Sequence, residues 1–303
     1  MFIDMVWLLF ALSGPILWGA SNVLDSALRR HYVKSDWTLA WLVATGRLPF
    51  ALVFLFFGGW NFPDWTSVFW MLICGIFWTL PFLFYFKALE TEDTSRVSIF
   101  LQMVPAFTLL NAILILNEKL TLSQGVSFGL LVVAGLLASF RAIRGKWRPG
   151  IAFAWLILSC FLWSLSDILF KKFEPAFANF NSAFATYLFG SFLVAAILAI
   201  HPVKRKDSIR LFSQLPMRAW AIICVNVVVG IIGTLLFNTA LTLGKASLTS
   251  AMMGIQPLAA FLIGLFLART MREISPEDVG KKALLIKLAS FILVVAGLAV
   301  LEV

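Results

Sequence analysis

Long apolar runs separated by short polar connections make up most of this chain. A helix needs about 20 apolar residues to cross the hydrocarbon core of a bilayer, and the pattern predicts ten such helices. The longest polar stretches between them cover residues 204–218 and 269–282, so no separate soluble domain is expected. The predicted spans are residues 5–27, 37–58, 66–88, 97–116, 122–141, 150–170, 181–201, 219–242, 247–268 and 283–301.

The two halves of the chain resemble each other. Leu-Trp-Gly-Ala-Ser-Asn at residues 17–22 aligns with Leu-Trp-Ser-Leu-Ser-Asp at 162–167, and Pro105 aligns with Pro257. We therefore predict two repeats of five spans each, residues 1–145 and 146–303. Because five is odd, the repeats must cross the membrane in opposite orientations. Inverted repeats with a binding site at their interface are typical of secondary transporters.

Composition narrows the class of protein. The chain is 61% hydrophobic and 13% charged, against about 45–50% and about 25% in ordinary soluble domains. A soluble enzyme is therefore excluded, and a nucleic-acid partner is not expected. The net charge of +9 has another explanation, because most Lys and Arg lie in the odd-numbered connections. The positive-inside rule then places those connections in the cytoplasm and both termini outside.

Motifs for metal or nucleotide chemistry are absent from the sequence. No His-Glu-x-x-His occurs, so an intramembrane zinc peptidase lacks its ligands. No Gly-x4-Gly-Lys-Ser/Thr loop occurs, so ATP does not drive the protein directly. We expect neither a metal nor a cofactor, and the driving energy must come from a substrate gradient, a counter-substrate or protons.

The residues around the fourth and fifth spans resemble a known family. Met-Val-Pro-Ala-Phe-Thr at 103–108, Asn-Glu-Lys-Leu at 117–120, and Gly125, Gly129 and Gly135 are similar to the signature of the drug/metabolite transporter superfamily, EamA type. The resemblance implies an all-α membrane protein, a single-chain bundle of ten helices that moves small solutes by alternating access. The second half departs from the pattern, since Thr270 stands where Glu118 is expected.

Asp167 is the leading candidate for coupling transport to protons. It lies mid-span, where a carboxylate costs about 2.5–3.5 kcal/mol on insertion scales, and its repeat mate is Asn22. It is a candidate for binding a proton or a cationic substrate group. The alternative is a structural role, in which Asp167 pairs with Lys171, four residues later on the same helix, or hydrogen-bonds a neighbouring helix.

The other candidates are aromatic and polar side chains inside the spans. The repeat mates Trp18 and Trp163 are expected to wall a central cavity, with packing as the alternative. Gln102 and Gln256 lie just before Pro105 and Pro257, which are expected to kink their helices and expose polar groups. The full set of predicted substrate-binding residues is Trp18, Asn22, Tyr85, Ser98, Gln102, Trp163, Asp167, Asn238, Ser250 and Gln256.

Three features are interpreted as structural. Arg47 lies within the second span and either binds a substrate carboxylate or, as we favour, pairs with a buried acceptor. Glu118 is expected to cap the helix that begins the fifth span. Gly125 and Gly129 form a GxxxG pattern that is expected to pack inside the bundle rather than form a dimer seam.

These patterns predict a transporter, not an enzyme, for small metabolites such as amino acids, working as an exporter or exchanger. It is expected in the cell membrane, surrounded by lipid, as a monomer or weak dimer. One alternative is a flippase of the same fold that moves a lipid intermediate. A second, an intramembrane aspartyl enzyme, is disfavoured because Asp25 is offset from the position that matches Asp167 in the repeat.

Overall fold

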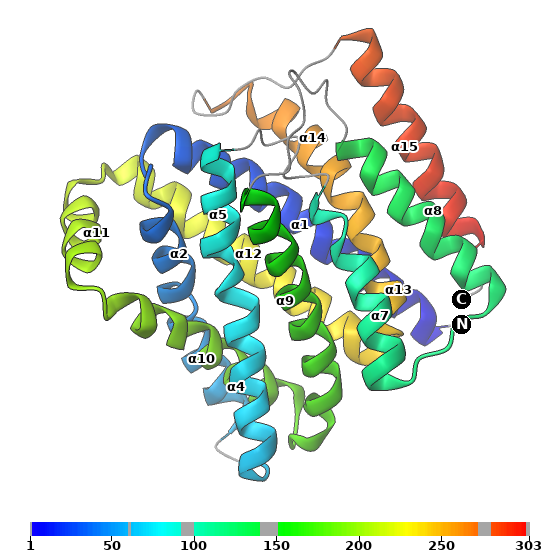
Figure 1. The fold of residues 1–303 in the computed structure, drawn as a ribbon, viewed down its shortest axis with the longest axis horizontal. Helices are drawn as coiled ribbons and strands as arrows, with labels where there is room; N and C mark the ends of the chain where they lie inside the picture. Colours follow the sequence, from blue (N-terminus) through cyan, green and yellow to red (C-terminus); the bar gives the residue numbers. More distant parts are fainter. Residues whose placement is uncertain (1, 60–61, 92–99, 140–150, 272–279, 301–303) are drawn as a thin grey trace.

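The structure is a computed structural model and describes residues 2–59, 62–91, 100–139, 151–271 and 280–300. Every regular element in these ranges is a helix, and the helices form one bundle (Figure 1). The helices of the first half are α1 (Phe2–His31), α2 (Asp36–Thr45), α3 (Leu48–Gly58), α4 (Trp65–Thr79), α5 (Pro81–Thr91), α7 (Val104–Leu116) and α8 (Leu122–Ser139).

The second half repeats this order with additions. Its helices are α9 (Ile151–Phe173), α10 (Phe180–Ala199), α11 (Pro202–Gln214), α12 (Met217–Leu243), α13 (Ala246–Ala251), α14 (Gln256–Leu267) and α15 (Lys281–Val300), with short 3-10 helices η1 (Glu174–Ala176) and η2 (Met252–Ile255). The predicted boundary between the repeats, at residues 145 and 146, lies outside the described residues.

Each predicted span contains helix. Among the described residues, seven helical segments are long and apolar enough to cross a membrane, and three shorter apolar helices match the fourth, fifth and tenth predicted spans. A multi-pass membrane protein is therefore confirmed, while a total of ten crossings stays a prediction.

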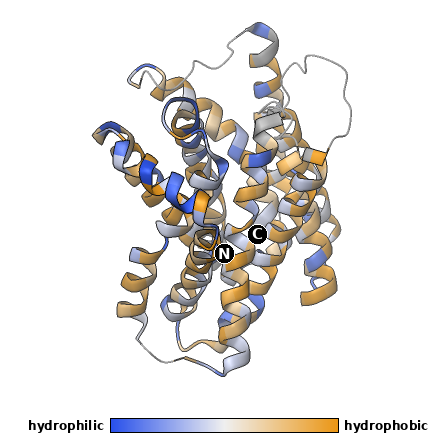
Figure 2. Ribbon diagram, turned by 60° about the vertical axis from the view of Figure 1, so that its left-hand side comes forward, coloured by the Kyte–Doolittle hydropathy of each residue, from blue (hydrophilic) through white to orange (hydrophobic). Residues whose placement is uncertain are grey.

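The outer surface of the bundle is apolar. Phe56 and Phe57 on α3, Leu122 on α8 and Phe266 on α14 are all exposed. Figure 2 shows hydrophobic residues along most of the helices and hydrophilic residues gathered mainly near the helix ends. Water would disfavour such a surface, whereas lipid tails match it.

Two predicted spans are broken in their middle. The second span stops at Gly46 and Arg47 and resumes as α3, with Pro49 in the first turn of α3. The third span breaks between α4 and α5, which begins at Pro81. Proline has no N–H to donate and its ring clashes with the preceding turn, so a continuous helix is interrupted there.

The repeat-related prolines also mark helix boundaries. Val104 and Pro105 begin α7, and Gln256 and Pro257 begin α14, with proline in the first turn in both cases. The segment before Pro257 tightens into η2. The interruption that the sequence predicted therefore occurs at equivalent places in both halves.

The two halves exchange their first helices. In the described residues α1 packs against α12 and α14 of the second half, and α9 packs against α4, α5 and α7 of the first half. The last helices of the halves, α8 and α15, pack against each other. This pattern is what a two-fold relation between the halves produces, and it makes the centre of the bundle an interface between repeats.

Glycine allows close helix packing at Gly75, whereas Gly125 and Gly129 face open space. A Cβ on Gly75 of α4 would overlap backbone atoms of α10, where Gly190 sits opposite. By contrast, a Cβ on Gly125 or Gly129 would meet nothing within 4 Å. The expectation that this GxxxG pattern packs inside the bundle is therefore wrong, because both glycines lie on the outer face of α8.

The polar stretch before the eighth predicted span contains a helix that the sequence analysis treated as a loop. His201 accepts a hydrogen bond from the Lys204 N–H and caps the start of α11. Phe212 of α11 stacks on Trp41 at 5.6 Å, and Ser208 is 2.8 Å from the Thr38 hydroxyl. Helix α11 is thus held against α2 by one polar and one aromatic contact.

Candidate functional site

A cluster of aromatic side chains occupies the centre of the interface between the halves. Trp18 lies 5.1 Å from Trp78 and 4.8 Å from Phe237, measured between ring centroids. Trp163 lies 5.4 Å from Phe82. We call this set the central aromatic cluster, and its members are Trp18, Trp78, Phe82, Tyr85, Trp163, Tyr187 and Phe237.

The two repeat-related tryptophans meet at the same residue. Trp163 donates its indole N–H to the Trp78 carbonyl at 2.8 Å, while the Trp18 ring packs on the Trp78 ring. Both Trp18 and Trp163 are buried, with exposed fractions of 8% and 9%. The structure therefore brings the predicted tryptophan pair together and adds Trp78, which the sequence analysis did not select.

Asp167 lies one helical turn beyond Trp163 on α9 and is buried, with 3% of its surface exposed. Its electrostatic neighbours are Cys74 and Tyr187. Within the described part of the chain no hydrogen bond or ion pair reaches its carboxylate. The alternative that Asp167 pairs with Lys171 is wrong, because Lys171 is engaged elsewhere.

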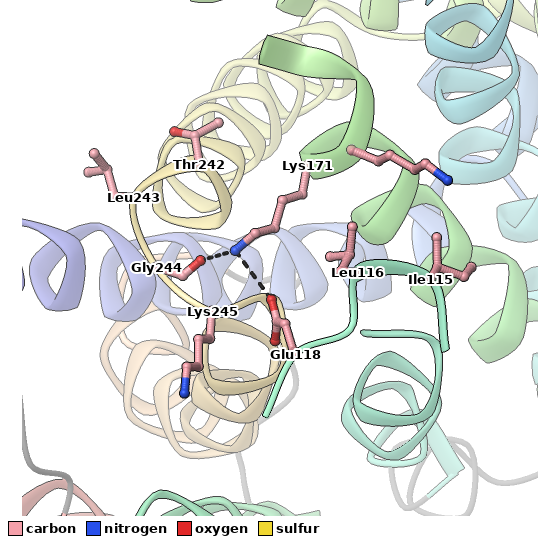
Figure 3. Close-up of a pocket in the computed structure, with 9 residues that line it drawn as sticks. Ile115, Leu116, Glu118, Lys171, Thr242, Leu243, Gly244 and Lys245 are labelled. Carbon is pink, nitrogen blue, oxygen red and sulfur yellow. Dashed lines mark hydrogen bonds and ion pairs between the residues drawn. The ribbon is translucent and has the colours of Figure 1, made fainter. Parts of the chain in front are cut away.

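Lys171 forms an ion pair with Glu118 at one end of the bundle, with 3.3 Å between Nζ and Oε1. Figure 3 shows Lys171 extending from α9 to both Glu118 and the carbonyl of Gly244. These side chains border an open groove of about 690 Å³. The residues that line it are Ile115, Leu116, Glu118, Lys171, Lys172, Thr242, Leu243, Gly244 and Lys245.

Glu118 caps a helix, but not the one expected. Its carboxylate accepts hydrogen bonds from the Ala246 N–H at 2.7 Å and from the Ser247 N–H and hydroxyl at 3.2 and 2.7 Å. These groups belong to the first turn of α13, in the opposite repeat. Helix α8 is capped instead by Thr121 and Gln124, which hydrogen-bond each other's backbone N–H groups. We call Glu118, Lys171, Ala246 and Ser247 the Glu118 cluster.

The pKa of Glu118 is lowered by this environment. Partial burial alone raises the pKa of a carboxyl group, because it disfavours the charged form. The two backbone N–H groups, the Ser247 hydroxyl and the Lys171 ammonium outweigh that effect and hold the pKa below its usual value. Glu118 is therefore ionised at neutral pH and ties the first repeat to the second.

The remaining polar candidates are dispersed. Asn238 is buried and donates to the Thr234 carbonyl on its own helix at 2.9 Å. Ser250 is buried and contacts the Met253 sulfur at 3.8 Å. Gln102 is buried with its Oε1 against Gly135 of α8.

Four predicted substrate-binding residues remain. Gln256 is half-buried, and its backbone carbonyl lies beside Gly19 of α1. Asn22 is half-buried on α1, next to Ser21. Tyr85 belongs to the central aromatic cluster, 6.1 Å from Trp163. Ser98 lies outside the described residues.

A polar network between α1 and α12 was not predicted. Asn226 donates to Asp25 Oδ1 at 2.6 Å and accepts a hydrogen bond from the Ser21 hydroxyl, also at 2.6 Å. Asn226 interrupts an apolar run, Ile-Cys-Val-Asn-Val-Val-Val at residues 223–229, and that interruption was the available signal. Among the described residues no group of three His, Cys, Asp or Glu side chains is placed to hold a metal ion.

Comparison with known proteins agrees with the helical order and the two halves. The fold matches a solved structure that is titled only as the crystal structure of a protein. The match covers 96% of this chain and 94% of the other, with a TM-score of 0.69 and 15% sequence identity. At that identity the match shows the fold alone. No curated protein matches the chain. The family model of the EamA-like transporter family matches twice, at residues 5–140 and 150–275. These matches cover most of the chain and fall one in each half, and the chain therefore belongs to the EamA-like transporter family.

Proposed function

We propose that this membrane transporter is secondary active and exports or exchanges small metabolites such as amino acids by alternating access. The family supports transport as such. The broken helices and the exchange of first helices between the halves support a substrate path along the interface of the repeats. The aromatic faces of Trp18 and Trp163 supply a surface for an apolar or aromatic substrate group.

The observation that carries the proposal is the buried carboxylate of Asp167. The titratable groups shown to interact with it are the Cys74 thiol and the Tyr187 phenol, neither of which is a cation at neutral pH. A buried carboxylate without a counter-charge favours binding a proton or a cation. We assign Asp167 the coupling role, with protons as the coupling ion, in a transporter of the cell membrane.

The test uses purified protein in liposomes. The vesicles are loaded with the twenty proteinogenic L-amino acids, and exchange of each labelled amino acid is measured with and without a pH gradient. Asp167→Asn should keep exchange under equal pH and lose accumulation driven by the gradient. Asp207→Asn, an exposed aspartate on α11, serves as the matched control and should behave as the natural protein.

Two outcomes count against this function. Unchanged gradient-driven accumulation in Asp167→Asn would contradict the coupling role of Asp167. No exchange of any amino acid by folded protein would favour the alternative, the flipping of a lipid intermediate, and labelled lipid head groups would then be the cargo to test.

A further inference from the structure

Arg47 is a buried cation that the groups around it leave unsatisfied. It lies at the break between α2 and α3 and only 6% of its surface is exposed. Its Nη1 is buried and has no hydrogen-bond partner. In the described residues no carboxylate forms an ion pair with it, so the structural pair expected from the sequence is not found there.

The charged neighbours of Arg47 do not replace such a partner. Asp25 and Tyr187 interact with it electrostatically. The Asp25 Oδ1, however, accepts its hydrogen bond from Asn226 on α12. An arginine at membrane depth normally faces an acceptor or water, and a buried donor without a partner costs about 1–3 kcal/mol. Arg47 is thus held ready for an acceptor that the described protein residues do not supply.

Two more donors near this position are also unsatisfied. The Trp78 Nε1 and the Thr79 Oγ1 are buried without a hydrogen-bond partner. Both residues lie at the end of α4, and α10 packs against α2, α3 and α4 together. Tyr187 of α10 connects the two places, because its ring is 6.5 Å from the Trp78 ring and it neighbours Arg47. The helices that flank Arg47 and the helix that carries Trp78 therefore all pack against α10, and each of these two residues holds a buried donor without a partner.

We propose that Arg47 binds the carboxylate of the transported solute, with Trp78 as a second donor. A planar guanidinium binds a carboxylate through two parallel hydrogen bonds. Asp25 interacts electrostatically with Arg47, and this nearby acidic group favours a singly charged carboxylate over a doubly charged phosphate. This inference rests on the proposed function and specifies its substrate chemistry.

The same geometry assigns a place to an amino group. Tyr187 interacts electrostatically with both Arg47 and Asp167, so the cation and the buried carboxylate both lie within electrostatic range of one side chain. A zwitterion that places its carboxylate at Arg47 directs its ammonium group toward Asp167. The central aromatic cluster, to which Tyr187 belongs, then receives the side chain of the solute.

The test measures thermal unfolding in detergent with matched probes. One trio is L-phenylalanine, 3-phenylpropionate and 2-phenylethylamine, which share a ring and differ in their charged groups. A second trio is L-leucine, 4-methylpentanoate and 3-methylbutylamine. In the natural protein, the amino acid and the carboxylic acid of at least one trio should both raise the melting temperature. The amine of that trio should raise it less or not at all.

A matched pair of variants then assigns the effect. Arg47→Gln should lose the rise caused by the carboxylates, while Arg210→Gln, an exposed arginine on α11, should keep it. If Arg47→Gln does not fold, the comparison of probes on the natural protein still tests whether binding requires a carboxylate. An amine that stabilises as strongly as its carboxylates, no shift with either trio, or a retained shift in folded Arg47→Gln would each overturn the proposal. If the natural protein binds the carboxylates but shows no gradient-driven transport, that result would count against proton coupling and not against carboxylate binding at Arg47.

Discussion

Trp163 donates its indole N–H to the Trp78 carbonyl at the point where α4 ends before Pro81. The carbonyls in the last turn of a helix have no partner within the helix. The donor comes from α9, in the other half of the chain. One side chain of the second repeat therefore completes the hydrogen bonding of a broken span in the first.

Replacing this donor should weaken the bundle. Trp163→Phe keeps most of the ring and leaves the buried Trp78 carbonyl unsatisfied, at a cost of about 1–2 kcal/mol. Thermal unfolding in detergent should show a lower melting temperature. Trp155→Phe, on the same helix and half-buried against Phe84, with no hydrogen bond from its indole among the described residues, should change it less. Equal effects of the two variants would count against the hydrogen bond.

Two adjacent lysines of the groove, Lys171 and Lys172, should differ sharply in their contribution to stability. Lys171 pairs with Glu118 and bonds the Gly244 carbonyl, whereas Lys172 is exposed and lies 5.9 Å from the Phe173 ring. Lys171→Gln should lower the unfolding free energy by about 1–3 kcal/mol, because the half-buried Glu118 loses its counter-charge. Lys172→Gln should leave it nearly unchanged. Unfolding curves of both variants against the natural protein make the comparison.

The Glu118 cluster should make stability depend on pH in acid. The folded state lowers the pKa of Glu118, so its stabilising contribution is complete above the unfolded value of about 4.3. It is lost as the pH falls through the lower, folded value. Melting temperatures measured from neutral pH to below pH 4 should therefore fall more steeply for the natural protein than for Glu118→Gln. Parallel curves would contradict this assignment.

Glycine substitutions should separate a packed face from a lipid face. Gly75→Ala places a methyl group 2.9 Å from the Gly190 carbonyl carbon and closer still to other backbone atoms of α10, where backbone cannot yield easily. It should reduce folded yield or stability by about 1–3 kcal/mol. Gly125→Ala meets open space and should be neutral or slightly stabilising, since alanine favours helix. Size-exclusion profiles and melting temperatures measure both.

The sequence predicted the class, the spans and the repeats because they depend on apolar length and on local similarity. The helix boundaries at Pro105 and Pro257 followed from the chemistry of proline. The meeting of Trp18 and Trp163 at one place followed from the repeat. These features depend on neighbouring residues or on symmetry, which a single sequence carries.

The partners of charged residues were harder to predict, because they lie in segments that are far apart in the sequence. Lys171 lies four residues from Asp167, which suggested a pair along one helix, yet it reaches Glu118 in the connection between α7 and α8. Glu118 precedes α8, yet it caps α13. Spacing along a helix gives what a side chain can reach, and the packing of the two halves decides which acceptor it meets.

In the part of the second repeat that the structure describes, the Glu118 cluster has no counterpart, and this inequality has an energetic consequence. Two identical inverted halves would make the conformer open to one side of the membrane equal in energy to the conformer open to the other. The position that matches Glu118 is Thr270, whose hydroxyl bonds only the Leu267 carbonyl of its own helix in the described residues. The Glu118 cluster thus fastens one end of the bundle between the halves through an ionised group, whereas the Thr270 hydroxyl makes no hydrogen bond to the opposite half among the described residues. We expect this inequality to break the degeneracy and to favour the conformer in which the Glu118 end is closed.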